Sequence, residues 1–215
     1  MNINSKKRGR PLGFDRPAAL HAAMLTFWQF GYAGTSITDL TRSMGISAQS
    51  LYSSFGSKSE LYHEALDLYQ NSFCLVMKNA LAQTGNCLLA IENMLLKAAQ
   101  LYTDTTHPRG CMIATANLGC ASENCQEVIY LSRLRKNMTR RIHERISLGI
   151  KAGDLISPKT NADTLSTYIS MLLQGMSVQA QDGATETELA CIVENVMKMI
   201  RQEYTHKENS TVLQI

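Results

Sequence analysis

Apolar residues recur at helical spacing along almost the whole chain, and no run of β-branched residues alternates with polar ones over more than a few positions. Glycine, proline and capping residues divide this pattern into separate segments. The polar stretches 1–14 and 205–215 are expected to form a flexible arm and a frayed tail. The spacing predicts an all-α fold of about nine helices, over 15–31, 36–44, 47–54, 57–83, 86–104, 111–119, 122–152, 161–181 and 185–204.

Several of these segments begin with residues whose side chains can satisfy free backbone amides. Asp15 and Asn86 are good N-cap residues. Three other segments begin with a Ser or Thr that is followed three positions later by an acid, which is the capping-box pattern. The three pairs are Ser36 with Asp39, Ser57 with Glu60, and Thr185 with Glu188.

Two short helices separated by a tight turn predict a helix-turn-helix over 35–55, with Gly45 permitting the turn. The apolar residues that would pack between the two helices are Ile37, Leu40, Met44, Ile46, Leu51 and Phe55. Small, flat or hydrogen-bonding side chains are left on the outer face of the second helix, at Ser47, Ala48, Gln49, Ser50 and Tyr52. Such a face can enter a DNA major groove about 12 Å wide. A helical hairpin with a polar face toward solvent is the alternative.

Length and charge support a nucleic-acid partner. A chain of 215 residues, with 45% hydrophobic and 18% charged residues, is long enough to bury a core without disulfides or metals. The net charge of +3 is concentrated at one end, because residues 1–66 hold seven Lys or Arg against four Asp or Glu and the rest of the chain holds fourteen of each. A basic end on a neutral body indicates one anionic partner bound there.

The basic arm contains Arg8-Gly9-Arg10-Pro11, which resembles the core of an AT-hook. Two arginines around a glycine can lie in a narrow minor groove, where the potential is most negative. The alternative is a solubilising or cloning-derived tail. No apolar segment follows the arm, and no stretch approaches the roughly 18 apolar residues of a membrane span. We therefore expect a cytoplasmic protein without a membrane partner.

Residues 16–68 resemble the DNA-binding domain of the TetR family of bacterial transcription regulators. The pattern Gly-Tyr-x-Gly-Thr-Ser-Ile lies at 31–37, and Leu-Tyr-x-x-Phe-x-Ser-Lys-x-x-Leu lies at 51–61. Ala22-Ala23, Phe27 and Ile46-Ser47 add to the match. The remaining chain matches the family by helix number and length. The resemblance implies four parts: a flexible basic arm at 1–14, a three-helix helix-turn-helix domain at 15–60, a larger helical ligand-binding and dimerisation domain at 61–204, and a tail at 205–215.

The resemblance also implies DNA-binding roles. Thr35 and Ser36 would hold a phosphate through their hydroxyls and a helix N-terminus, and Lys58 would hold a second phosphate. The residues facing the groove would be Ser47, Ala48, Gln49, Ser50 and Tyr52, with Tyr52 on the backbone and Arg8 and Arg10 added by the arm. Gln49 is the best candidate for reading a base, because its amide can pair with adenine; a solvated Gln49 is the alternative. Trp28, Leu51 and Phe55 are assigned to the core.

In this family the last two long helices form a dimer interface. One apolar stripe comprises Leu165, Tyr168, Leu172, Met176 and Gln179, and a second comprises Leu189, Ile192, Val193, Val196, Met197 and Ile200. A single small body cannot hide both stripes, so part of this surface is expected to be covered by a second copy. The expected partners are therefore a homodimer mate and a near-palindromic double-stranded DNA operator.

The resemblance further implies a cavity for an unknown small-molecule effector. Helical periodicity places it among segments 73–77, 94–101, 112–118, 130–138 and 171–176. The polar residues that would orient a ligand there are Gln100, Tyr102, Asn117, Tyr130, Tyr168 and Gln174.

Six cysteines are interpreted as reduced thiols, and no Cys-x-x-Cys pair or recognised zinc pattern occurs. We expect neither a metal nor a cofactor. Arg109 adjoins Cys111 and can lower the pKa of its thiol. Some relatives in the TetR family respond to electrophiles or oxidants through cysteine, so Cys111 and Cys120 are candidate redox residues. Buried structural cysteine is the alternative.

No nucleophile elbow, phosphate-binding loop, dinucleotide-binding glycine pattern or paired carboxylate is present, so an enzyme is not expected. The favoured function is a ligand-responsive DNA-binding regulator, with repression as the usual mode of the family. A thiol-based sensor regulator using Cys111 and Cys120 is an alternative. An architectural DNA-binding protein is a more distant one, because the neutral body argues against it.

Overall fold

The computed structural model describes residues 13–115, 126–156 and 160–205. These residues form helices joined by turns and loops, with no strand among them. The helices are α1 (Arg16–Gly34), α2 (Ile37–Met44), α3 (Ala48–Phe55), α4 (Lys58–Asn71), α5 (Leu75–Leu81), α6 (Cys87–Thr103), α7 (Gln126–Ala152), α8 (Ala162–Gln181) and α9 (Glu186–Thr205). The all-α prediction is confirmed.

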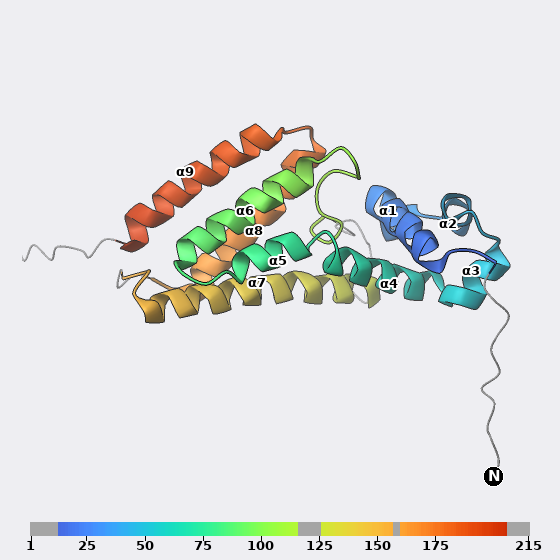
Figure 1. The fold of residues 1–215 in the computed structure, drawn as a ribbon, viewed down its shortest axis with the longest axis horizontal. Helices are drawn as coiled ribbons and strands as arrows, with labels where there is room; N and C mark the ends of the chain where they lie inside the picture. Colours follow the sequence, from blue (N-terminus) through green and yellow to red (C-terminus); the bar gives the residue numbers. More distant parts are fainter. Residues whose placement is uncertain (1–12, 116–125, 157–159, 206–215) are drawn as a thin grey trace, which may run out of the picture.

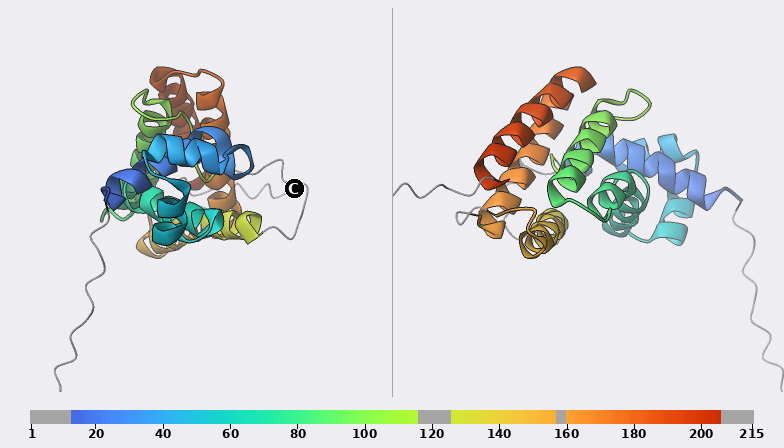
Figure 2. Two further views of the ribbon diagram at one scale, coloured as in Figure 1. Left: turned by 90° about the vertical axis from the view of Figure 1, so that its right-hand side faces the viewer. Right: turned by 60° about the vertical axis from the view of Figure 1, so that its left-hand side comes forward.

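The molecule is elongated, with α1–α3 at one end and α8 and α9 toward the other (Figures 1 and 2). We call α1–α3 the head and α4–α9 the body. In the body, α6 packs on α5, α8 and α9, while α7 packs against α8 and α6 and extends beneath α4. One hydrophobic cluster runs from the head through the body, from Phe27 and Leu40 to Val193 and Met197.

The predicted caps at Asp15, Ser36, Ser57, Asn86 and Thr185 are confirmed. The Asp15 side chain accepts a hydrogen bond from the amide of Ala18, and Asn86 caps α6. Both halves of the capping box are present at α2 and at α4. At α9 the Thr185 amide donates to Glu188 Oε2 at 2.7 Å. Each cap uses residues close in sequence, so the sequence alone determines it.

The predicted helix over 57–83 is wrong, because α4 ends at Asn71 and α5 begins at Leu75. Ser72 leaves the helical conformation (φ −115°, ψ −80°), and its hydroxyl donates to the Leu68 carbonyl at 2.6 Å. The break lets Phe73 pack edge-on against Trp28, with ring centroids 5.1 Å apart, and places Cys74 in the core with 4% exposure. Tertiary packing therefore interrupts an apolar pattern that continues at helical spacing.

The predicted helix over 111–119 is also not formed in its described part, since residues 111–115 make a turn. This turn docks on α8 at a point of close approach. The Cys111 amide donates to Ser177 Oγ at 2.7 Å, and Gly110 has a φ of 78°. A Cβ at Gly110 would lie 2.8 Å from the Ser177 carbonyl oxygen, so this position requires glycine.

None of the described helices is both long and apolar enough to cross a membrane.

A second close approach joins α7 to α6 and yields a stability prediction. A Cβ at Gly149 would lie 2.6 Å from Cys87 Cβ and would also meet its Sγ. Gly149→Ala should lower the free energy of unfolding by about 1–3 kcal/mol, because the added methyl group overpacks this contact. Urea unfolding at one fixed protein concentration measures the change.

The matched control is Gly34→Ala, at the end of α1. Its Cβ would make only an ordinary 3.7 Å contact with Phe30 Cβ. This variant should stay within about 1 kcal/mol of the wild-type stability. Equal stability of the Gly149→Ala protein and the wild type would contradict the tight α6–α7 contact.

Candidate nucleic-acid interface and ligand cavity

The outer face of α3 is exposed and polar. Ser47 caps the helix, and its Oγ accepts a hydrogen bond from the Ser50 amide at 3.1 Å. Ala48 and Gln49 are exposed, and the Tyr52 side chain is 51% exposed. Ser50 is half-buried. The structure therefore brings the five predicted groove-facing residues together in the first turns of one helix, which is the end that enters a major groove in helix-turn-helix proteins.

The inner side of the motif is packed, as predicted. Leu51 is fully buried, and Phe55 and Trp28 are 3% and 6% exposed. Gly45 takes the left-handed conformation (φ 66°) that the turn between α2 and α3 requires. Arg16 then fixes α3 relative to α4: its guanidinium forms an ion pair with Glu64 at 2.8 Å and lies 4.3 Å from the centre of the Phe55 ring.

Thr35 is placed differently from the prediction. It is 1% exposed, and its hydroxyl donates to the Gly31 carbonyl at 2.6 Å, where the backbone turns at the end of α1. A buried, bonded hydroxyl is not available to a DNA phosphate. Ser36 is exposed at the N-terminus of α2, where its hydroxyl bonds to the Asp39 carboxylate.

Lys58 is half-buried at the start of α4. Its ammonium lies 4.3 Å from the centre of the Tyr32 ring. Burial lowers the pKa of Lys58, and the Glu127 carboxylate acts in the opposite direction. The structure thus places Lys58 at the junction of α1, α4 and α7, and its phosphate contact stays a prediction.

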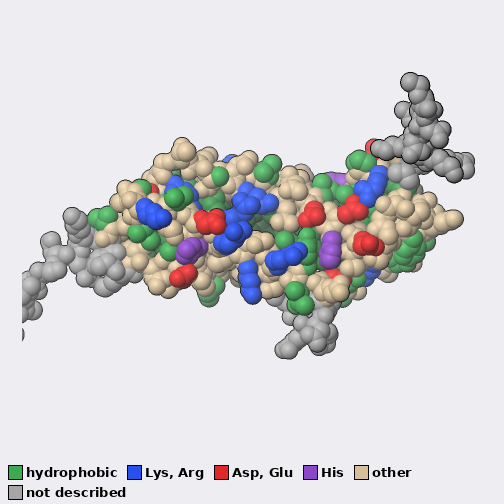
Figure 3. All heavy atoms as spheres, turned by 90° about the horizontal axis from the view of Figure 1, so that it is seen from below, with side chains coloured by type: hydrophobic (Ala, Val, Ile, Leu, Met, Phe, Trp, Pro, Cys, Tyr) green, Lys and Arg blue, Asp and Glu red, His purple; other side chains and the backbone are tan. Residues whose placement is uncertain are grey.

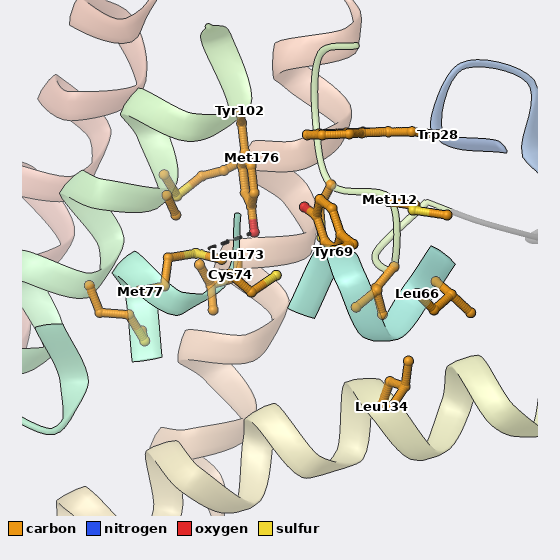
Figure 4. Close-up of a cluster of buried hydrophobic side chains, with 14 of the residues drawn as sticks. Trp28, Leu66, Tyr69, Cys74, Met77, Tyr102, Met112, Leu134, Leu173 and Met176 are labelled. Atoms are coloured by element: carbon orange, nitrogen blue, oxygen red, sulfur yellow. Dashed lines mark hydrogen bonds between the residues drawn. The ribbon is translucent and has the colours of Figure 1, made fainter. Parts of the chain in front are cut away.

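A cavity of about 150 Å³ lies in the body among α5, α6, α7, α8 and the turn after Gly110. The aromatic and aliphatic side chains of its inner wall meet from different elements, with Cys74, Met77, Tyr102, Leu134 and Leu173 in one cluster (Figure 4). Its lining residues are Gln70, Cys74, Met77, Lys78, Tyr102, Cys111, Ile113, Ala114, Leu134, Arg135, Asn137, Met138, Arg140, Arg141, Ser170, Leu173 and Gln174.

Only some of the six predicted ligand-binding residues line the cavity. Tyr102 and Gln174 line the cavity. Gln100 is exposed beside Lys97, Tyr130 donates a hydrogen bond to Asp67 at 3.0 Å, and Tyr168 is on an exposed face of α8. None of these three lines the cavity. Asn117, Cys120, Arg8 and Arg10 lie outside the described residues.

Cys74 and Cys111 meet at the inner wall of the cavity, where both thiols are free and buried. Hydrogen bonding from Cys74, assisted by Tyr69 and by the amides of Ile113 and Ala114, lowers the pKa of Cys111 to about 6, although burial acts in the opposite direction. Of the two coupled thiols, Cys111 is the one whose pKa is lowered, while the pKa of Cys74 is raised. The sequence could not reveal this pairing, because the two residues are far apart in the chain.

An aromatic cluster joins the head to the cavity wall. Trp28 of α1 packs edge-on against Tyr69, with ring centroids 4.8 Å apart, and stacks on His107 at 4.4 Å. Figure 4 shows Trp28 and Tyr69 beside the cavity cluster. A rearrangement of the wall can therefore reach α1 through Tyr69, which interacts with Cys111, and through Phe73, which precedes Cys74 in the chain.

A second face of α8 and α9 stays exposed. It carries apolar side chains at helical spacing, and each is 39–64% exposed: Tyr168, Met171 and Val178 on α8, and Ile192 and Met199 on α9. Leu165, Met176, Leu189, Val193, Met197 and Ile200 from the two predicted stripes are instead buried within the chain.

Among the residues described, no group of three or more His, Cys, Asp or Glu side chains could hold a metal ion.

Comparison with known proteins adds to this geometry. Residues 19–65 match the family model of bacterial regulatory proteins, tetR family. The chain is 30% identical to the HTH-type transcriptional repressor ComR of Escherichia coli (strain K12) over 195 residues, covering 90% of this chain and 92% of the relative. It is 25% identical to the repressor BdcR of the same organism, over 93% of this chain and 97% of the relative.

A solved structure shows the same fold. It is a cysteine mutant of the TetR family transcriptional regulator CifR, complexed with 26-bp double-strand operator DNA. It is similar to this chain with a TM-score of 0.84 and 34% identity, covering 88% of this chain and 98% of that chain.

Proposed function

The chain belongs to the TetR family of bacterial regulatory proteins, and from this premise we propose that it is a ligand-responsive transcriptional repressor. It binds a near-palindromic operator as a homodimer and releases it when a small molecule enters the cavity of the body. The observation that carries this proposal is the exposed polar face of α3 on a head that is packed against Tyr69, the neighbour of the cavity residue Cys111.

Like the other members of its family, the protein is a DNA-binding transcription regulator. It is not an enzyme. The α3 face supplies side chains for base and phosphate contacts, and the exposed Ser36 hydroxyl at the N-terminus of α2 supplies a further phosphate contact. We assign the DNA-binding domain to 15–60 and the ligand-binding and dimerisation domain to 61–204, so that the first turn of α4 belongs to the DNA-binding domain. A regulator of bacterial DNA acts in the cytoplasm.

Like other members of its family, the protein acts as a dimer. The exposed apolar face of α8 and α9 supports this arrangement, since a face of this kind is normally covered by a partner. A two-fold interface places two copies of α3 about 34 Å apart, or a multiple of that distance, to enter successive major grooves.

The effector switch follows from the connection between α4 and α7. Ser59 donates to Glu127 at 2.6 Å, and Tyr130 donates to Asp67 at 3.0 Å, so α7 holds α4 at two points. A ligand in the cavity changes the separation of α5 and α7, and this tilts α4 and with it the head. Two heads that tilt apart lose the spacing of the operator.

A second candidate function rests on Cys111. Its lowered pKa and its place in the cavity wall favour a thiol that reacts with electrophiles or oxidants. Modification would add atoms to a packed wall and produce the same tilt as a bound ligand.

The DNA-binding proposal is tested by selection from a random double-stranded DNA library with the purified full-length chain. We expect one near-palindromic sequence to be enriched, with half-sites one helical turn apart or a multiple of it. Enrichment without any common sequence would instead favour an architectural DNA-binding protein.

Gln49→Ala should relax discrimination at one base pair of each half-site by about 1–3 kcal/mol, because the variant lacks the amide that pairs with that base. The measurement is fluorescence anisotropy with the selected operator and its single-base variants. The comparison variant, Lys58→Ala, should weaken all sequences alike and reduce the salt slope by about one unit for each phosphate that Lys58 neutralises. Equal effects of Gln49→Ala on operator and random DNA would show that Gln49 reads no base.

Met171→Glu should convert the dimer into a monomer, because it places a charge in the apolar face of α8, where Met171 is 64% exposed. Light scattering at micromolar concentration measures the mass. Lys151→Glu, an exposed charge change at the end of α7, is the control and should stay dimeric. A monomeric wild-type protein would contradict the proposed interface.

The thiol alternative predicts that N-ethylmaleimide releases the wild-type protein from its operator and that Cys111→Ser abolishes this release. Cys191→Ser removes an exposed cysteine and should leave the release intact. If Cys111→Ser protein is still released normally, Cys111 is structural.

A further inference from the structure

The cavity of the body has an apolar inner part and a basic outer part. Met77, Tyr102 and Leu173 are buried at its inner wall, with exposures of 2%, 3% and 6%. Arg140 and Arg141 are exposed and belong to the outer part. Lys and Arg side chains gather over the middle of the face that α7 forms (Figure 3). A ligand in this cavity would therefore be amphipathic.

The charge of the lining is one-sided. Lys78, Arg135, Arg140 and Arg141 line the cavity, and no Asp or Glu does. Arg140 is paired with Glu144, which lies outside the cavity, at 3.5 Å. Within the described ranges, the other three cations form no ion pair with a carboxylate.

The hydrogen bonds of these cations do not neutralise them. Lys78 Nζ donates to the Gln70 carbonyl at 2.8 Å, and Arg135 Nη1 donates to the Ile113 carbonyl at 3.0 Å. Burial lowers the pKa of Lys78; the guanidinium of Arg141 acts in the same direction, and Cys74 and the Asp67 carboxylate act in the opposite one. Lys78 therefore loses hydration on burial without gaining an ion pair, and an added anion would stabilise its charged form.

The acidic side chains of the lining are Cys74, Tyr102 and Cys111. Hydrogen bonding raises the pKa of Cys74, burial raises the pKa of Tyr102, and hydrogen bonding from Cys74 lowers the pKa of Cys111. Even with Cys111 ionised, the three cations that form no ion pair leave the lining positive.

We propose that the effector of this cavity is a small organic monoanion with a compact apolar body, of the size and charge of an aromatic carboxylate. The size follows from the cavity volume of about 150 Å³, which is the volume of an engineered protein cavity that binds benzene. The charge follows from the guanidinium groups, which bind carboxylates through paired charge-assisted hydrogen bonds. This inference rests on the proposed function, in which the cavity receives the effector.

A free hydroxyl group completes the site. Ser170 of α8 lines the cavity, is 7% exposed, and its Oγ has no hydrogen-bond partner among the described residues. Buried hydroxyl groups in folded proteins are normally paired, so Ser170 is free to donate to an oxygen of the ligand. It belongs to a different wall of the cavity from Lys78, since Ser170 comes from α8 and Lys78 from α5.

The anion would also act on the switch. Lys78 belongs to α5, whereas Arg135 and Arg141 belong to α7. An anion between them replaces mutual repulsion by attraction and draws the two helices together. Because α5 follows the break after α4, this movement reaches the helix that carries the head.

The experiment uses three probes with one ring and different charges: benzoate, benzamide and benzylamine. Each is titrated into the full-length dimer by isothermal calorimetry, with Trp28 fluorescence as a second signal, because Trp28 is the chain's single tryptophan and packs beside the cavity wall. We expect benzoate to bind, benzamide to bind about tenfold or more weakly because it cannot form the charge-assisted hydrogen bonds, and benzylamine not to bind.

Two arginines of α7 provide a matched pair of variants. Arg141→Gln removes a cation of the cavity and should weaken benzoate about tenfold, with little effect on benzamide. Arg133→Gln makes the same charge change on the same helix, but Arg133 lies over the Tyr130 ring and outside the cavity lining. It should leave benzoate binding unchanged.

The outcomes separate the two proposals. Benzamide or benzylamine binding as tightly as benzoate, equal effects of both variants, or no binding by any probe would overturn the anionic effector. Operator binding by the same protein without a probe tests the regulator independently. If the protein without a probe shows no sequence-selective DNA binding, the proposed function is overturned instead.

Discussion

The arrangement of this molecule depends on one aromatic cluster, in which Trp28 packs against Tyr69, Phe73 and His107. Trp28 comes from the head, Tyr69 and Phe73 come from the two sides of the end of α4, and His107 comes from the loop that leads to Cys111. An aromatic pair of this kind contributes about 0.5–1.5 kcal/mol beyond its buried area. The head, the break after α4 and the cavity wall are therefore parts of one packed unit.

The break after α4 connects the Trp28 cluster to the cavity, because it orients Phe73 and Cys74. In a continuous helix from Ser57 to Gln83, the side chains of Phe73 and Cys74 would point in different directions around the helix axis. They could not both contact the loop near Cys111. By leaving helical geometry at Ser72, the chain directs Phe73 toward Trp28 and Cys74 toward the cavity. Cys74 at the cavity wall directly follows Phe73 at the head contact, so a displacement of Cys74 also displaces Phe73.

The head could be predicted from the sequence almost in full, because its structure is local. Capping boxes, Gly45 and the apolar spacing of α2 and α3 act within a few residues, and the resemblance to a known family extended over the same segment. Thr35 is the exception: its hydroxyl bonds to the carbonyl of Gly31 and is buried. A motif match specifies a residue type, but it does not distinguish a group that contacts DNA from one that shapes the turn.

The cavity could be predicted only as a region, because it is assembled from residues that are distant in the chain. Periodicity selected apolar segments and located most of the walls, but it gave no reason to place charged side chains in the cavity. Lys78 and Arg141 lie outside the predicted segments, and Arg135 lies within segment 130–138 but was not among the six predicted ligand-binding residues, although all three line the cavity. The signal that remained in the sequence was the density of Lys and Arg in α7, where seven of them stand against two Glu.

The energy available to the switch is consistent with this architecture. An effector shifts the dimer only by its difference in affinity for the two states, and such coupling energies are commonly about 1–3 kcal/mol. One or two aromatic contacts of the size formed by Trp28 cover the same range. Rearrangement of that cluster can therefore change the spacing of the heads without unfolding any helix. By linkage, the same coupling requires operator DNA to weaken effector binding by an equal factor, so α3 and the cavity act as opposing sites on one equilibrium.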